Sequence, residues 1–220
     1  MRVVVLGTGT NVGKTYVTAR LANALAKTTR VLALKPVESG VTDEAATDAA
    51  TIAQGAGHPA VASPWRFAEP VSPHLAARAC GAVLSVPEIA HWVVAAERRY
   101  QPDVTLVETA GGVFSPLSPI ATNADLAGAL ESSLWLLVAP DSLGVLHDVS
   151  ATLRALRAGY RRPDAVVLSS PRAPDASSGT NAAELAKLGI TDVRLTLGPN
   201  ASGVDGLAAW LLAQANIKDR

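Results

Sequence analysis

The sequence predicts a single-domain α/β protein with a doubly wound, mainly parallel sheet and helices on both faces. Apolar runs of strand length alternate along the chain with Ala- and Leu-rich segments of helical period. Apolar residues are 49% of the chain and aromatic residues only 4%, so the core must consist mostly of Ala, Val and Leu. Such a core is typical of helices packed on a parallel sheet. The alternation of strands with helices implies right-handed crossovers.

The individual elements follow from these runs and from the Gly, Pro or Ser residues that end them. Six strands are predicted at residues 2–7, 30–36, 103–112, 133–140, 164–170 and 193–198. Four helices are predicted at residues 14–27, 86–100, 146–160 and 204–215. No Pro-, Gly- or Ser-rich linker divides the 220 residues, so we expect one domain spanning residues 1–220.

Charge and cysteine content restrict the possible partners and the compartment. Nineteen basic residues balance nineteen acidic ones without a basic stripe, which predicts no nucleic-acid or membrane partner and favours a small molecule. The single Cys80 excludes an internal disulfide and is expected to be a small buried residue. The chain enters a strand at once and has no run of about 20 apolar residues, so we expect a cytoplasmic protein.

The stretch "GTGTNVGKT", residues 7–15, predicts a phosphate-binding loop. It lies between a predicted strand and a predicted helix, where free backbone N–H groups and the helix dipole attract anions. Lys14 is expected to reach the β- and γ-phosphates, and the hydroxyl of Thr15 to bind Mg²⁺. The spacing is a variant, because Thr8 stands where the usual pattern has its first glycine.

Three further clusters fall at predicted carboxyl ends of strands, where α/β sheets bind ligands: residues 35–39, 108–112 and 140–148. Lys35 in "KPVESG" is either a ligand-binding cation or a solvated edge residue. Glu108 in "VETAGG" suits Mg²⁺, which prefers one or two carboxylates, although it could instead be a capping residue. Asp48, with Asp43 as its rival, is either a second metal ligand or a residue of a helix start. The four histidines lack metal-ligand spacing.

Taken together, these motifs resemble those of dethiobiotin synthetases. The segments "GTGTNVGKT", "KPVESG", "FAEPVSPH", "VETAGGVFSPLS" and Leu143–Gly144 follow one another in that family's order. The phosphate loop alone marks only the wider class of P-loop NTPases. The resemblance implies a dimeric ligase of biotin synthesis that uses ATP, Mg²⁺ and CO₂ to close a cyclic urea on 7,8-diaminononanoate.

The resemblance also implies roles for individual residues. Lys35 and Lys14 would be catalytic, and Mg²⁺ would be held by Thr15, Asp48 and Glu108. The nucleotide would contact Thr10, Asn11, Val12, Gly13, Lys14, Thr15, Asp48, Glu108, Gly111, Ser169, Ser170, Leu195, Thr196 and Leu197. The diamine would contact Thr10, Ser39 and Gly112, and its carboxylate tail would bind the partner subunit's helix start at Gly144, Val145, Leu146 and His147.

Some positions depart from the family's pattern, and two other functions remain open. Ser169 and Ser170 stand where an adenine-reading Asn is common, and a serine cannot pair with adenine through two hydrogen bonds. Thr109 stands where Gly is usual, and a β-branched residue disfavours positive φ. The alternatives are a related ATP-dependent ligase acting on another small substrate, and a partition or positioning ATPase switch. A switch usually has a second lysine early in the loop, where this chain has Thr8, Gly9 and Thr10.

Overall fold

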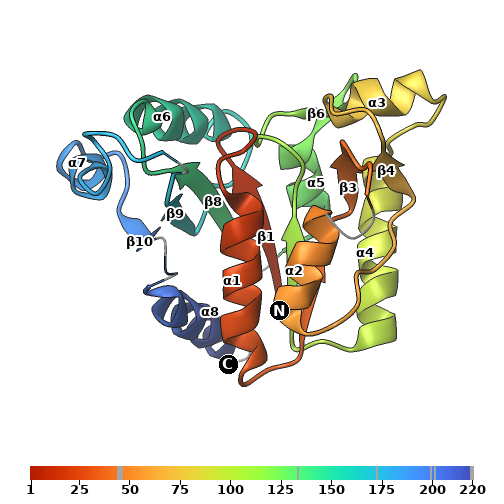
Figure 1. Cartoon of the computed structure of the whole chain (residues 1–220), viewed down its shortest axis with the longest axis horizontal. Coiled ribbons are helices and arrows are strands. Elements are labelled where there is room, and N and C mark those ends of the chain that lie inside the picture. Colours follow the sequence, from red (N-terminus) through yellow and green to blue (C-terminus); the bar gives the residue numbers. More distant parts are fainter. Residues whose placement is uncertain (44–46, 133, 172, 199, 201, 219–220) are drawn as a thin grey trace.

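The computed structural model describes residues 1–218 except 44–46, 133, 172, 199 and 201. Its centre is a six-stranded sheet in which every pairing is parallel, in the order β10-β9-β8-β1-β5-β2 (Figure 1). The strands are β1 (Arg2–Gly7), β2 (Val31–Leu34), β5 (Val104–Glu108), β8 (Leu134–Pro140), β9 (Ala165–Ser169) and β10 (Val193–Leu197). All six belong to runs that the sequence predicts as strands; residue 133, where one of those runs starts, lies outside the described residues.

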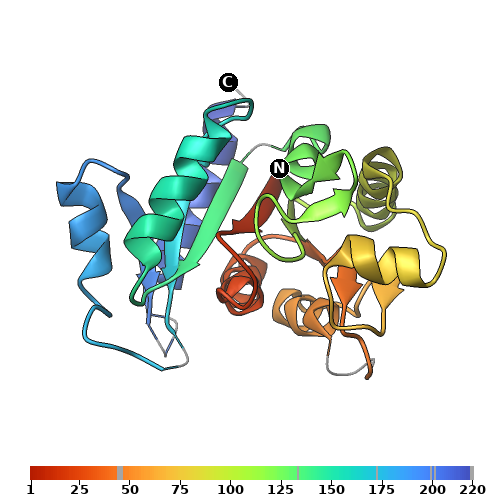
Figure 2. The ribbon, with the colours of Figure 1, turned by 90° about the horizontal axis from the view of Figure 1, so that it is seen from above.

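Helices cover both faces of this sheet (Figure 2). They are α1 (Lys14–Ala26), α2 (Asp48–Ala56), α3 (Pro73–Ala79), α4 (Val86–Tyr100), α5 (Asn123–Ala129), α6 (Val145–Leu156), α7 (Asn181–Lys187) and α8 (Val204–Lys218). Successive strand residues point to opposite faces and therefore supply two cores. In β1, Val3 and Val5 pack with α1, α2 and α8, whereas Val4 and Leu6 pack with the helices of the other face. The doubly wound fold class is confirmed.

Two small sheets lie outside the central one. One pairs β3 (Val37–Ser39) with β4 (Trp65–Phe67) in parallel, and the other pairs β6 (Pro116–Ser118) with β7 (Ala121–Thr122) in antiparallel orientation. Strands of two or three residues carry no measurable periodicity, which is why the sequence does not predict them. The first of these sheets extends the chain beyond Lys35 and so places Ser39 away from the central sheet.

Two sequence expectations about single residues have different outcomes. Asp48 is the first residue of α2, as predicted, and the side chain of the preceding Thr47 accepts a hydrogen bond from Ala50 N. Cys80 was expected to be buried, but it is exposed. It follows the last turn of α3, and the helix buries Ala76 and Ala77 instead. Among the described residues, no helix combines the length and the apolar character needed to cross a membrane.

Helices α1 and α2 pack without room for a side chain at Gly55. A Cβ atom at Gly55 would lie 2.4 Å from the backbone oxygen of Ala19. We expect Gly55→Ala to lower the free energy of unfolding by about 1–3 kcal/mol, because the two helix backbones must separate. Urea unfolding measures this change. Gly128→Ala in α5 is the control, since a Cβ there meets no atom within 4 Å; equal midpoints for the two variants would contradict the packing argument.

Candidate active site

The loop between β1 and α1 is shaped to expose backbone N–H groups. Gly13 caps α1 with φ of 90°, Asn11 has φ of 59°, and no side chain caps the helix. A Cβ at Gly13 would lie 2.5 Å from the hydroxyl of Ser169, so both the backbone angle and the space require glycine. The helix N-terminus therefore keeps its free donors and positive dipole end for an anion.

Lys14 lies folded over this loop. Its Nζ donates to the carbonyl of Gly9 at 2.9 Å, and the side chain is buried. Burial, together with the positive charge of Lys35, lowers the pKa of Lys14 from 10.5 to about 8. A buried ammonium whose pKa is depressed is stabilised by an added negative charge, which a phosphate would supply.

Lys35 connects the two carboxylates predicted for the site. Its Nζ lies 2.6 Å from Glu108 Oε1 and 3.0 Å from Asp48 Oδ2. Lys35 is 5% exposed and Glu108 is fully buried, so the reading of Lys35 as a solvated edge residue is wrong. Thr15 Oγ1 donates to the same Glu108 oxygen at 2.8 Å. This arrangement brings together residues from β5, α1, α2 and the segment after β2.

The charges of this cluster stabilise one another. Burial by itself lowers the pKa of Lys35, but the negative charges of Glu108 and Asp48 outweigh it and hold that pKa above its ordinary value. Burial alone would raise the pKa of Asp48, yet the ammonium of Lys35 holds it below its usual range. Lys35 and Asp48 are therefore both charged near neutral pH.

Thr15, Asp48 and Glu108 form a donor set that fits Mg²⁺. Glu108 Oε2 is buried and has no hydrogen-bond partner among the described residues, and Asp48 is half exposed towards the cavity. Mg²⁺ is usually bound by one or two carboxylates together with phosphate oxygens and water. Within the described part of the chain, no group of three or more His, Cys, Asp or Glu suits a metal, so phosphate oxygens would have to complete the shell.

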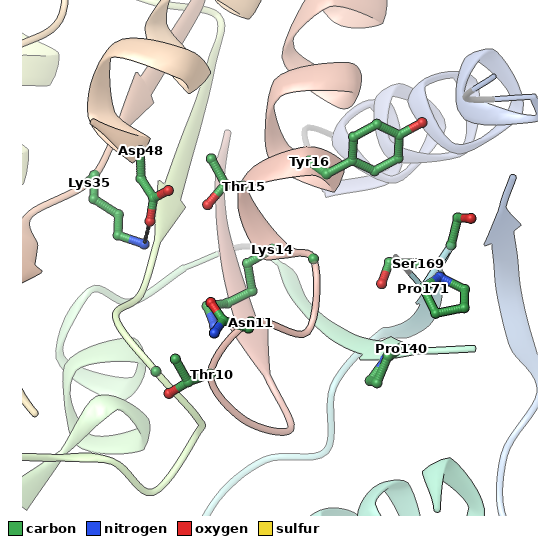
Figure 3. Close-up of a pocket in the computed structure, with 13 residues that line it drawn as sticks. Thr10, Asn11, Lys14, Thr15, Tyr16, Lys35, Asp48, Pro140, Ser169 and Pro171 are labelled. Carbon is green, nitrogen blue, oxygen red and sulfur yellow. Dashed lines mark hydrogen bonds and ion pairs between the residues drawn. The ribbon is translucent and has the colours of Figure 1, made fainter. Parts of the chain in front are cut away.

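The cavity above the loop has a volume of about 500 Å³ (Figure 3). Lys35 and Asp48 lie at one end, Lys14 and Asn11 in the middle, and Ser169 with Pro171 at the other end. It is lined by Thr10, Asn11, Gly13, Lys14, Thr15, Tyr16, Lys35, Asp48, Gly111, Pro140, Ser169, Ser170 and Pro171. Pro140 begins the cluster 140–148 that the sequence places at this edge. The sequence did not single out Tyr16 or Pro171, because isolated apolar and aromatic residues carry no motif.

Ser169 has a different environment from Ser170 at the far end of the cavity. The hydroxyl of Ser169 is buried and donates to the carbonyl of Val12 at 2.6 Å, whereas Ser170 is partly exposed. The structure does not bring Leu195, Thr196 and Leu197 of β10 into the described lining of the cavity. Leu197 is fully buried in the core. Tyr16 reaches the end of that strand, since its hydroxyl donates to the carbonyl of Gly198 at 3.2 Å.

The glycines after β5 allow two loops to approach closely. A Cβ at Gly112 would lie 3.3 Å from Gly9 Cα, and one at Gly111, whose φ is 76°, would lie 2.6 Å from Ser115 Oγ. Thr109 fits this loop without positive φ, and its hydroxyl donates to the carbonyl of Val5 at 3.1 Å. The β-branched side chain is therefore compatible with the observed backbone.

The remaining predicted substrate residues lie outside the main cavity. Ser39 ends β3 and lines a second cavity, which includes Asp48 as the main one does. The segment 144–147 begins α6, where Gly144 has φ of 98° and no side chain caps the helix. Leu143, just before it, is 85% exposed. The helix start thus lies at the surface without a side-chain cap, although Val145 N already donates to the carbonyl of Ser142 at 3.2 Å.

Comparison with known proteins assigns the chain to a family. A family model described as "AAA domain" matches residues 1–199. The ATP-dependent dethiobiotin synthetase BioD of a Caulobacter species is 41% identical over 78% of this chain and 77% of its own length. The proteins of the same name from Streptomyces coelicolor and Saccharopolyspora erythraea are 40% and 37% identical, and this chain covers 77% and 94% of their lengths. The chain belongs to the ATP-dependent dethiobiotin synthetase family.

Solved structures agree on the fold at low sequence identity. A ParA family ATPase from Chlorobium tepidum is 14% identical, with a TM-score of 0.53 over the whole chain and 93% of that structure. Chloroplast FtsY from Physcomitrella patens is 19% identical, with a TM-score of 0.51 over 93% of this chain and 59% of its own. These likenesses show the P-loop NTPase-like fold of this synthetase family member and nothing about its substrate.

The charge cluster can be tested without any ligand. We expect Glu108→Gln to lower the free energy of unfolding by about 3 kcal/mol, because the buried ammonium of Lys35 loses its closest counter-charge. The double variant Lys35→Met with Glu108→Gln should recover much of that loss, since no unpaired buried charge remains. Urea unfolding measures both.

A matched control comes from an exposed ion pair. Arg30 and Asp103 lie 3.1 Å apart with side chains 70% and 48% exposed, so Asp103→Asn should leave the unfolding midpoint nearly unchanged. If the double variant is no more stable than Glu108→Gln alone, the pairing of Lys35 with Glu108 does not explain the loss.

Proposed function

We propose that this protein is the ligase that converts 7,8-diaminononanoate, CO₂ and ATP into dethiobiotin, ADP and phosphate in biotin synthesis. The observation that carries the proposal is the Lys35, Glu108 and Asp48 cluster beside the phosphate loop, in a chain that belongs to the ATP-dependent dethiobiotin synthetase family. The cluster provides positive charge and metal ligands at the place where the γ-phosphate would lie.

The proposed reaction needs mainly positioning and charge. One substrate amine takes up CO₂ as a carbamate and loses a proton, and a carbamate oxygen then attacks the γ-phosphate and releases ADP. The second amine attacks the carbamoyl carbon, phosphate leaves, and loss of a proton completes the cyclic urea. Negative charge develops on the phosphoryl oxygens, so the ammonium groups of Lys14 and Lys35 stabilise it best in the transition state.

We assign the other residues accordingly. Thr10 to Thr15 would hold the triphosphate with their backbone N–H groups, and Gly111 and Gly112 would offer backbone groups to the reacting centre. Thr15, Asp48 and Glu108 would hold Mg²⁺, which neutralises charge on the phosphate oxygens when bound. Ser39 would contact the diamine. Ser170 and Pro171, with Tyr16 opposite, would surround the base.

A homodimer in the cytoplasm is part of the same proposal. The start of α6 is uncapped and bordered by the exposed Leu143, which suits binding of a carboxylate from a neighbouring subunit's substrate.

Specific observations support two other functions less well than the proposed ligase. A partition-type switch is disfavoured because the loop has no early lysine and the curated relatives are named as synthetases. A related ligase with another small substrate shares the same phosphate chemistry, so only the product distinguishes it. Phosphate release with ATP, Mg²⁺ and bicarbonate should depend on 7,8-diaminononanoate, and mass spectrometry should find dethiobiotin. Hydrolysis that ignores the diamine would overturn the proposal.

The role of Lys35 predicts a split between kinetic constants. Lys35→Ala should lower kcat about 100- to 1,000-fold and change the KM for ATP little, because its contact with the phosphoryl group strengthens in the transition state. Steady-state kinetics with ATP varied at saturating diamine measures this. A change confined to the KM for ATP would refute the catalytic role, and a melting curve of the variant excludes simple unfolding.

Reading of the base can be tested at Ser170. Ser170→Asn should raise the ratio of kcat/KM for ATP over CTP roughly fivefold, since an amide can pair with the adenine edge through two hydrogen bonds. Ser169→Asn is not equivalent, because the hydroxyl of Ser169 is buried against Val12 and its Cβ adjoins Gly13. An unchanged ratio for Ser170→Asn would place base recognition on other groups.

A further inference from the structure

Glu38 is a buried carboxylate of the "KPVESG" segment to which neither the sequence analysis nor the proposed chemistry assigns a role. It lies in the middle of β3 and is 6% exposed. Its Oε1 accepts a hydrogen bond from Asp48 N at 2.6 Å, and the N–H of Ala49 also bonds to this carboxylate. One oxygen thus fixes the start of α2, which carries Asp48.

The second oxygen of Glu38 has no such explanation. Oε2 is buried and has no hydrogen-bond partner among the described residues. Leaving a buried carboxylate oxygen unpaired costs folding free energy, so native structures rarely keep one without a function. The unpaired oxygen therefore indicates a donor that the described part of the chain does not supply.

Glu38 lines a separate cavity of about 180 Å³ next to the phosphate site. Its described lining consists of Glu38, Ser39, Gly40, Val41, Thr42, Asp43, Thr47 and Asp48. Three of these residues are acidic and none is basic, so the cavity attracts cations and repels carboxylates. Because Asp48 also lines the main cavity, a ligand held here lies beside the phosphate end of that cavity.

The chemistry of the lining favours an amine over a metal ion. The described residues contain no group of three or more acidic, His or Cys side chains placed to hold a metal. An alkylamine, by contrast, is charged near neutral pH, as a lysine is, and its N–H groups need only separate acceptors. Glu38 Oε2 and the hydroxyl of Ser39 are acceptors on neighbouring residues.

We propose that this cavity binds an amino group of the diamine substrate through Glu38 Oε2, with Ser39 as a second contact. The proposal rests on the proposed function for the identity of the diamine. The proposal adds Glu38 to the substrate-binding residues. It also assigns to this cavity the selection of a diamine over a substrate that has a single amine.

The test uses Glu38→Gln in the full-length enzyme. The glutamine can keep its oxygen towards Asp48 N and so retains the start of α2, but it places an NH₂ group where Oε2 lies and thereby replaces the proposed acceptor with a donor. We expect the KM for 7,8-diaminononanoate to rise at least about tenfold, with the KM for ATP and the melting temperature unchanged. Glu88→Gln on the exposed face of α4 is the control for loss of one charge, and it should change none of these values.

Direct binding separates this proposal from the proposed function. Calorimetric titration of the diamine into wild type and Glu38→Gln, without ATP, is measured beside turnover. If Glu38→Gln binds the diamine more weakly than wild type, the proposed binding site is supported. If wild type then fails to form the cyclic urea, only the proposed function is wrong. If wild type forms the cyclic urea and Glu38→Gln has the same KM and affinity for the diamine as wild type, the proposed role of the cavity is wrong and the proposed function stands. The same conclusion follows if Glu38→Gln loses stability and ATP affinity together with diamine binding. Wild type that neither binds nor converts the diamine overturns both.

Discussion

The buried ion pair between Lys35 and Glu108 is the interaction on which the site depends. Strand β2 pairs in parallel with β5, and Leu34 lies opposite Val107, so the next residues along both strands meet at the same edge. An isolated charge could not be buried there, but the two together can be. The order β1-β5-β2 is therefore a condition for the chemistry as well as for the fold.

This pair also connects the layers of the protein. Thr15 of α1 donates to the same Glu108 oxygen that Lys35 contacts, and Asp48 at the start of α2 lies on the other side of the ammonium. Lys35 is thereby surrounded by negative charge, whereas Lys14 has its pKa lowered by burial and by Lys35. The two lysines differ accordingly: one is already paired within the protein, and the other is stabilised most by an incoming anion.

The sequence predicts those parts of this arrangement that are long enough to show a hydrophobic period or that contain a local motif. Residues 2–7 and 86–100 have the predicted bounds, since a continuous apolar run and an amphipathic period identify them. The phosphate loop and the cluster around Lys35 follow from strand-end positions. Strands β3 and β6 and seven-residue helices such as α5 are too short to show a period. The partners of Ser169 and Glu38 depend on contacts distant in sequence, which no local pattern contains.

The loop's shape is fixed by contacts from several strands, and this bears on how it binds. Thr8 N donates to the carbonyl of Val138 in β8, Ser169 of β9 holds the carbonyl of Val12, and Val113 N donates to the carbonyl of Gly7. A loop held by three separate segments loses less conformational entropy when a phosphate binds, so more of the contact energy appears as affinity. Ser169 contributes to that rigidity only because Gly13 has no side chain. The same close fit uses the one hydroxyl proton of Ser169 for the loop, so that hydroxyl has no proton left to donate to a ligand in the cavity.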